Sequence, residues 1–113
     1  MILIEKVVSD YLNNTLDNPT YTQEPHNGET DYYLIEKVGS SVSNKIDGSM
    51  IVIESHASSR YEAAQMNLEV IEAMDNIITL DDITRCEKNS DYDYTDTSRK
   101  DYRYRALFEL THY

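Results

Sequence analysis

The residues of this chain best suited to bind a metal ion are three histidines and one cysteine: His26, His56, Cys86 and His112. Zinc sites usually take their ligands from short motifs, in which two ligands lie about two to five residues apart. Here His56 lies 30 residues from His26, 30 from Cys86 and 56 from His112. Because these spacings match no ligand motif, we expect no metal site.

The candidate nucleophiles are Cys86 and the Ser58-Ser59 pair. A catalytic thiol or hydroxyl needs an adjacent base, and Cys86 has none near it in sequence. Ser59 is instead followed three residues later by Glu62, the pattern of a helix capping box. The acid pairs Asp81-Asp82 and Asp91/Asp93 lack the spacing of a calcium loop. The sequence therefore predicts no enzyme, since catalysis would need a pocket with converging titratable groups.

Tyrosine and arginine gather near the C-terminus, at Tyr92, Tyr94, Arg99, Tyr102, Arg103, Tyr104 and Arg105. Such residues can stack on single-stranded nucleic acid, but the acids among them, such as Asp91 and Asp93, would repel its backbone. Tyrosine and arginine are also enriched at the centres of protein interfaces. We interpret Tyr92, Tyr94, Arg103 and Arg105 as a candidate subunit interface, and an ordinary cross-strand ladder explains them equally well.

The formal charge of −11 comes from 21 acidic and 10 basic residues. Most of the excess lies in residues 1–80, which hold 13 acids and 4 bases. This charge argues against a duplex-binding surface, which needs clustered lysine and arginine. It is compatible with a soluble monomer, with a mimic of nucleic acid, or with the wall of a passage that DNA crosses without sticking. Three glycines are too few for a phosphate-binding loop.

The elements that must position these residues are organised around the stretch from Ser58 to Ile78. After the capping box, apolar residues recur at helical spacing, at Tyr61, Ala64, Leu68, Ile71, Met74 and Ile78. Glu62, Gln65, Glu69, Glu72 and Asn76 share the opposite side. We predict that the first set packs on the core. The apolar run 50–56 before it predicts a strand that leads into this helix.

The N-terminal half of the chain predicts one helix and two strands. Residues 2–16 carry a helical apolar stripe that includes Leu3, and the helix should end near Asp17 because Pro19 follows. Residues 20–24 predict a weak edge strand, and 32–38 a strand antiparallel to 50–56. Asp47-Gly48 is a two-residue hairpin signal. The exposed arm around 40–49 is either a loop or a projecting hairpin that touches a neighbour.

The C-terminal third predicts two more strands. Residues 83–87 read as a strand, and the polar segment 89–98 is compatible with an extended ribbon. In it, 91–94 would pair with 100–104 and set acids opposite Arg103 and Arg105. From Tyr102 onward a strict period of two places Tyr102, Tyr104, Ala106, Phe108 and Leu110 on one face, toward the helices. The expected fold is α+β: a small antiparallel or mixed sheet of four to five strands with two helices on one face, in the order α-β-β-β-α-β-β. Residues 1–113 would form a single domain with an arm at about 39–49.

The chain carries no pattern of a membrane span or of a secretory signal peptide. Its single cysteine cannot form an internal disulfide, which fits a reducing compartment. We therefore expect a cytoplasmic origin and no membrane contact.

Three stretches together resemble the small tail-terminator and minor capsid (neck) proteins of long-tailed bacteriophages and prophages. They are YLIEKVGSS at 33–41, MIVIESHASSRYEAAQMNLEVIEAM at 50–74 and YRYRALFEL at 102–110. The shared features are a strand ending in Val-Gly, a strand running into Ala-Ser-Ser, a helix that begins with Glu62-Ala63-Ala64, and a closing Arg-Tyr strand.

This resemblance implies a virion structural protein that assembles as a homo-oligomeric ring, commonly of six subunits, without substrate or cofactor. Such a ring sits at the tail-neck junction, after assembly in the host cytoplasm. It ends tail-tube growth and contacts the major tail protein and a head-completion protein, and DNA passes through it without specific binding. By position, the arm with Ser43, Asn44, Lys45 and Asp47 would lie at subunit contacts, as would the Tyr/Arg strand.

Two further expectations follow for the acids. Glu62, Glu69 and Glu72 are candidates to face the channel of the ring, and a solvated outer face is the other reading of the same three residues. The alternative function, suggested by charge alone, is an acidic DNA mimic that inhibits a nucleic-acid enzyme of the host. It requires carboxylates in two rows at phosphate-like spacing.

Overall fold

The computed structural model describes residues 3–23, 30–43 and 46–112, with the backbone alone described at 40–43 and 46–47. Its elements are α1 (Ile4–Thr15), β1 (Thr20–Tyr21), β2 (Tyr32–Ser43), β3 (Ile46–Ala57), α2 (Arg60–Asp75), the 3-10 helix η1 (Ile77–Thr79), β4 (Ile83–Asp93) and β5 (Tyr102–His112). The fold is α+β, with two helices and a five-stranded mixed sheet in the predicted order of elements.

The strands lie side by side in the order β1-β2-β3-β5-β4. β1 is a short edge strand, as predicted, and runs parallel to β2 opposite Tyr33 and Leu34. β2 and β3 are antiparallel, which confirms the predicted pairing. The C-terminal strand β5 lies between β3 and β4 and is antiparallel to both. The last strand of the sequence therefore belongs to the middle of the sheet.

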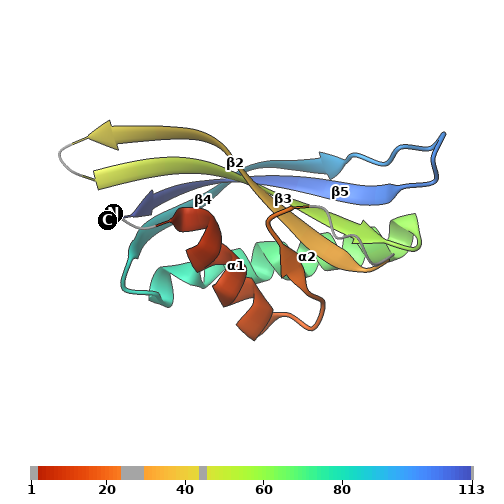
Figure 1. Ribbon diagram of the computed structural model, residues 1–113, viewed down its shortest axis with the longest axis horizontal. Helices are drawn as coiled ribbons and strands as arrows, with labels where there is room; N and C mark the ends of the chain where they lie inside the picture. The colour runs from red at the N-terminus through yellow and green to blue at the C-terminus, as the bar shows by residue number, and fades with distance from the viewer. Residues whose placement is uncertain (1–2, 24–29, 44–45, 113) are drawn as a thin grey trace.

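Both helices cover the same face of the sheet (Figure 1), and the core lies between the two layers. Strand residues alternate between this face and the open one. On β5, Ala106, Phe108 and Leu110 are buried against the helices, as the period of two predicted. On β3, Ile51 and Ile53 belong to the same core.

Helix α1 ends at Thr15, two residues before the predicted Asp17. The side chain of Asn13 accepts a hydrogen bond from the Thr20 backbone N–H at 2.8 Å and donates one to its carbonyl oxygen at 3.3 Å. These two bonds attach β1 to the helix. Ile4, Val8 and Leu12 are buried, whereas Leu3, which the predicted stripe included, is exposed.

Helix α2 begins at Arg60, directly after the N-cap that the sequence predicted. The Ser59 hydroxyl accepts a hydrogen bond from the Glu62 backbone N–H at 3.2 Å, which confirms Ser59 as the N-cap. The second half of the capping box differs, because the Glu62 carboxylate accepts a hydrogen bond at 2.6 Å from the Ser58 hydroxyl.

The buried face of α2 differs from the predicted one. The buried residues of the helix are Ala63, Met66, Asn67, Val70, Ala73 and Met74. Of the predicted core stripe, Tyr61 and Leu68 are 72% and 66% exposed, and Ile78 is also exposed. The prediction was right for Met74, which is buried, and for Ile71, which packs against the core, but wrong for Tyr61, Leu68 and Ile78. The helix carries a second apolar face, with Ala63, Val70 and Ala73, and this is the face that packs on the sheet.

The predicted turn at Asp47-Gly48 is also wrong. These two residues lie inside the β2–β3 ladder, opposite Val42 and Ser41, and the last described pair is Ser43 with Ile46. On their other side Asp47 and Gly48 pair with His112 and Thr111 of β5. Pairing on both sides holds them in an extended conformation within β3.

Strand β4 is longer than the predicted 83–87, since it runs to Asp93. Its polar end forms the expected ribbon with β5, in which Asp93 faces Tyr104 and the Tyr94 N–H donates to the Arg103 carbonyl oxygen at 2.9 Å. Main-chain pairing with a central strand thus extends β4 through a segment with little hydrophobicity.

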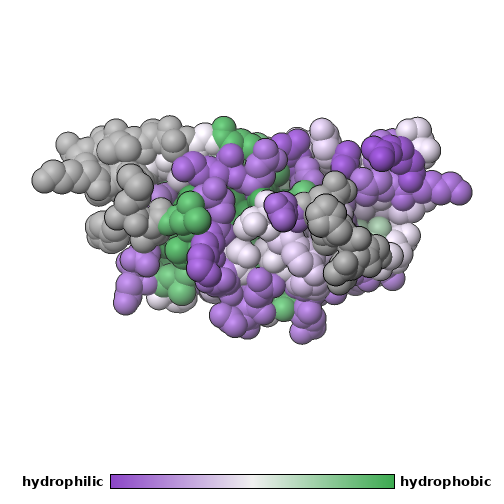
Figure 2. Space-filling model, viewed as in Figure 1, coloured by the Kyte–Doolittle hydropathy of each residue, from purple (hydrophilic) through white to green (hydrophobic). Residues whose placement is uncertain are grey.

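The molecule is elongated, with extents of 45 × 24 × 24 Å. The β2–β3 hairpin extends beyond both helices at one end, and the β4–β5 hairpin reaches the opposite end (Figure 1). Figure 2 shows hydrophobic residues gathered over the start of α1, while most of the described surface in that view is hydrophilic. In the described part of the chain, no helix is long and apolar enough to cross a membrane.

Candidate subunit interface

The four residues Tyr92, Tyr94, Arg103 and Arg105 come together on the sheet face that the helices leave open. Tyr92 faces Arg105 across the β4–β5 ladder. The Tyr94 ring receives both arginines, with the guanidinium carbon of Arg103 at 4.7 Å and that of Arg105 at 5.0 Å from its centroid. The Tyr92 and Tyr94 rings meet edge to face at 5.9 Å. The strand pairing thus builds an aromatic and cationic cluster from residues that the sequence singled out.

The two arginines of this cluster differ in their partners. The guanidinium of Arg103 donates to the Asp101 carboxylate at 3.1 Å and to the Tyr94 carbonyl oxygen at 2.8 Å. Arg105 has no hydrogen bond or ion pair to any described residue, and its Nε is buried without a partner. A guanidinium binds carboxylates through two parallel hydrogen bonds. No described carboxylate therefore bonds to the Arg105 guanidinium, although its charge acts on Glu54, which faces it across β3 and β5.

Beside the cluster lies Glu54, which faces Arg105 in the β3–β5 register. Its carboxylate lies 3.1 Å from His56 Nε2, while His56 Nδ1 lies 3.3 Å from the Asp101 carboxylate. Burial would raise the pKa of Glu54, but the His56 hydrogen bond and the charges of His56, Arg103 and Arg105 outweigh it and lower that pKa. The Glu54 carboxyl is thus held in its ionised form.

His56 is almost fully buried, and its ring stacks on Tyr32 at 4.6 Å between centroids. With both ring nitrogens near carboxylates, it is a hydrogen-bonded histidine within the sheet. The sequence reasoning missed its two acidic neighbours. The proximity of Glu54 to His56 could have been predicted, because residues two apart on a strand share a face. The proximity of Asp101 to His56 could not, since only the fold brings these two residues together.

The acids of the β4–β5 turn order the turn. The Asp93 carboxylate accepts hydrogen bonds from the Thr95 hydroxyl at 2.6 Å and backbone N–H at 3.0 Å. The Asp96 carboxylate accepts from the Ser98 hydroxyl at 2.7 Å. These hydroxyl hydrogen bonds are the main reason that the pKa values of both aspartates are lowered. Aspartates commonly stabilise turns in this way.

The other predicted contact residues lie far from the cluster. Ser43 and Asp47 belong to the β2–β3 ladder at the opposite end of the molecule, where their side chains are outside the described atoms. Asn44 and Lys45 lie outside the described residues. The structure therefore places the two sets of candidate interface residues at opposite ends of the long axis.

The three acids expected at a channel are all exposed on α2, on the helical side of the molecule. Glu62 accepts its bond from Ser58, and Glu69 accepts one from the Tyr33 hydroxyl at 3.4 Å. The Glu72 carboxylate has no hydrogen bond or ion pair to any described residue, so it is the free acid of the three.

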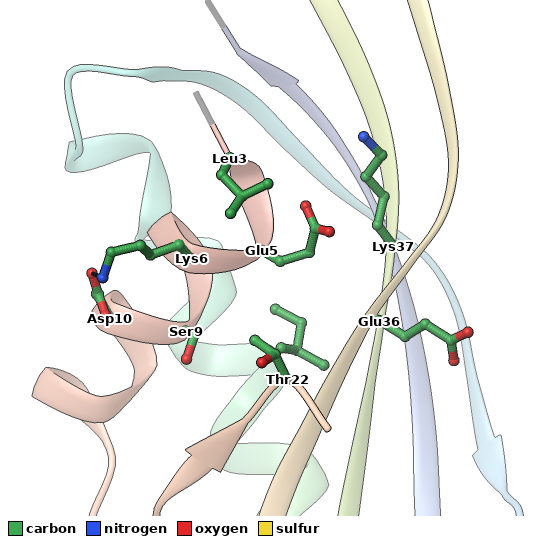
Figure 3. A pocket seen from close by; sticks show the side chains of 9 residues that line it. Leu3, Glu5, Lys6, Ser9, Asp10, Thr22, Glu36 and Lys37 are labelled. Carbon is green, nitrogen blue, oxygen red and sulfur yellow. Dashed lines mark hydrogen bonds and ion pairs between the residues drawn. The ribbon is translucent and has the colours of Figure 1, made fainter. Parts of the chain in front are cut away.

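A groove of about 550 Å³ separates α1 from β2. Figure 3 shows Glu5 on the side of α1 that faces β2, while Lys6 and Asp10 turn toward each other on the outer side. Lys6 and Asp10 form an exposed ion pair at 3.0 Å. No histidine or cysteine is among the described residues that line this groove. Its ionisable groups do not converge on one point, as a catalytic site would require.

The remaining reactive residues are buried or isolated. His112 Nε2 lies 2.8 Å from the Ser49 hydroxyl, and both residues are buried. Burial, together with the charges of Asp75 and Glu87, raises the pKa of the Cys86 thiol to about 12. Within the described ranges no three His, Cys, Asp or Glu side chains are grouped to hold a metal ion. His26 lies outside those ranges.

Neither the protein-family models nor the curated proteins compared with this chain match its sequence.

Proposed function

We propose that this protein is a virion structural subunit of a long-tailed bacteriophage or prophage. Copies of it form a ring, with six subunits as the expected number, at the head-proximal end of the tail. The ring ends growth of the tail tube and joins the tail to the head connector. Its partners are the major tail protein and a head-completion protein.

The resemblance on which this proposal rests falls on the central elements of the fold. Residues 33–41 lie in β2, 50–74 cover the end of β3 and most of α2, and 102–110 lie in β5. These elements form the middle of the sheet and the helix packed on it. The similar stretches are therefore contiguous in space as well as ordered in sequence.

The observation that carries the proposal is the β2–β3 hairpin, which continues past the helical layer (Figure 1). The two strands have 12 residues each, about twice the common strand length. Pairing of the two strands continues to Ser43 and Ile46, beyond the core residues Ile35 and Ile51. An extension past the helical layer offers surface to a neighbouring subunit.

The charge of the chain supports the passage of DNA through such a ring. With a formal charge of −11, copies arranged around an axis present a like-charged wall to the phosphates. Such a wall offers no binding sites that would slow the DNA.

The alternative of a DNA mimic is less well supported. It needs rows of unpaired carboxylates, whereas several acids of this chain already have basic partners. Asp10 pairs with Lys6, Asp91 with Lys88, and Asp93 with Arg60. These pairs neutralise charge at positions where a mimic would display it.

A variant without the arm tests the proposal. Residues 41–48 are replaced by Asn-Gly, which joins Ser40 to Ser49, a pair that already faces across the ladder. We expect the purified wild-type chain to form annular particles in negative stain and a multimer by light scattering. The shortened chain should keep its far-UV circular dichroism but stay monomeric.

The matched control is Leu3→Ser, which removes an exposed apolar side chain on α1 and should leave the rings intact. A wild-type chain that stays monomeric at high concentration, and that does not bind to tubes of the major tail protein, would contradict the proposal.

A further inference from the structure

The outer face of α2 carries an unpartnered patch, which we call the α2 patch: Tyr61, Leu68 and Glu72. At about 100° per residue these three side chains fall within about 40° of one another around the helix axis. Tyr61 and Leu68 are the two most exposed large apolar residues of the helix. The Glu72 carboxylate beside them has no partner in the described chain. The patch is therefore apolar with one free negative charge.

A second patch lies on the open face of the sheet and consists of Tyr92, Tyr94 and Arg105; we call it the β4–β5 patch. Its tyrosines are 42% and 40% exposed. Arg105 lies over the Tyr94 ring and makes no ion pair with a described residue. This patch is aromatic and carries one positive charge.

The two patches are complementary in composition and in charge. Among the described residues, seven large hydrophobic side chains are exposed, and four of them belong to these patches. Large exposed apolar side chains beside charged groups are typical of protein interaction sites. The α2 patch carries the negative charge of Glu72, and the β4–β5 patch carries the positive charge of Arg105.

The patches cannot meet within one copy. α2 lies on the helical side of the sheet (Figure 1), whereas Arg105 alternates with the core residue Ala106 and so lies on the open side. A contact between them must join two copies. Because the two surfaces differ, the contact is heterologous and repeats from copy to copy, which closes into a ring when the rotation permits.

We infer that the α2 patch of one copy docks on the β4–β5 patch of the next, with Glu72 paired to Arg105 of the neighbouring copy. The occupant of each patch is thus a second copy of this chain. This inference deepens the proposed function by naming the surfaces that join the subunits. It also moves Glu72 from the channel, where the sequence placed it as a candidate, into the contact.

The test is a charge swap. Glu72→Arg puts two positive charges in the contact, and Arg105→Glu puts two negative charges there. Each single variant should associate at least about 30-fold more weakly than the wild type, because like charges meet where opposite charges paired. An equimolar mixture of the two variants restores a Glu–Arg or Arg–Glu pair at every contact, with the two variants alternating. It should recover the wild-type mass in sedimentation equilibrium.

The double variant Glu72→Arg/Arg105→Glu should assemble alone for the same reason. Asp82→Arg is the matched control, because it makes the same charge change at an exposed residue outside both patches. Circular dichroism checks that each variant folds. Glu72 lies on an exposed helix surface, so Glu72→Arg tests the contact even if Arg105→Glu does not fold.

Two results separate this inference from the proposed function. If wild type and both single variants form the same rings, the docking assignment is overturned while the ring stands. If the swap rescues association but the particles are open filaments that do not cap tail tubes, the docking assignment holds and the tail function fails. A swap that fails to rescue, or a wild type that never associates, overturns the inference.

Discussion

At the residue scale, Glu54 and Arg105 face each other but form no ion pair, because each contacts a different side chain. The two residues face each other across β3 and β5, so a cross-strand ion pair would be the simple expectation. Glu54 instead bonds to the buried His56, and Arg105 leans over the Tyr94 ring. Strand register alone therefore does not decide which charges pair. Here the stacking of His56 on Tyr32, and of the Arg105 guanidinium on the Tyr94 ring, decides which charged groups pair.

Cys86 supplies a prediction at the same scale. Its pKa is raised from 9.0 to about 12, which lowers the thiolate fraction at pH 8 by about 1,000-fold. Since the thiolate is the reactive form, we expect the folded chain to react with a disulfide reagent at least about tenfold more slowly than the urea-unfolded chain. The rate is measured by absorbance of the released thiol, with Cys86→Ser as the blank.

The sign of the linked effect on stability follows from the direction of the shift. The folded-state pKa lies above the unfolded one, so ionisation of the thiol favours unfolding. The stability that Cys86 contributes is complete below pH 9 and is lost as the pH rises toward about 12. Equal reaction rates in the folded and unfolded chains would contradict the burial of this side chain.

At the scale of the elements, the start of α2 and the face that it buries are set by different interactions. Its first turn is fixed locally, by the hydrogen bond from the Glu62 N–H to Ser59. Its rotation about its own axis is fixed by the sheet, which accepts the face with Ala63, Val70 and Ala73. The second apolar face then remains outside and is available for a neighbour.

A pair of substitutions tests this rotation. Met74 is fully buried, so Met74→Ala should lower the free energy of unfolding by about 2–5 kcal/mol. Leu68 is exposed, so Leu68→Ala should change that free energy by no more than about 0.5 kcal/mol. Urea denaturation of the monomeric chain at low concentration measures both values. A loss of stability for Leu68→Ala as large as that for Met74→Ala would mean that the face with Leu68 is packed in the folded chain.

At the scale of the whole molecule, one core joins every layer. Buried side chains from α1, β2, β3, α2, η1, β4 and β5 form a single cluster. β5 lies between β3 and β4, so the C-terminal strand closes the sheet only after the rest of the chain is present. The helices and strands therefore depend on each other for their burial.

This arrangement predicts a single cooperative transition. Far-UV circular dichroism, which follows the helices and strands, and tyrosine fluorescence, which follows side-chain packing, should give coincident urea curves for the monomer. Two separated transitions would show that the β2–β3 hairpin or α1 unfolds independently, in conflict with a shared core.

The sequence alone determined the class and order of the fold, because its signals there are local. The Ser59 cap, the period of two in β5 and the proline after α1 each constrain nearby backbone, and each predicted element formed. It also predicted the pairing of 91–94 with the start of β5, but not its register: acids were expected opposite the arginines, whereas Tyr92 faces Arg105 and Asp93 faces Tyr104.

Only the tertiary structure decided which side of α2 is buried, that Asp47 and Gly48 lie within β3, and which charged side chains form no ion pair. Each of these depends on contacts made in the folded chain. Pairing with β5 holds Asp47 and Gly48 extended, and packing on the sheet selects the inner face of α2. A hydrogen bond from His56 holds the Glu54 carboxylate away from an ion pair with Arg105. Periodicity ranks the faces of one element by hydrophobicity, whereas packing ranks them by fit to a neighbour, and in α2 these two rankings differ.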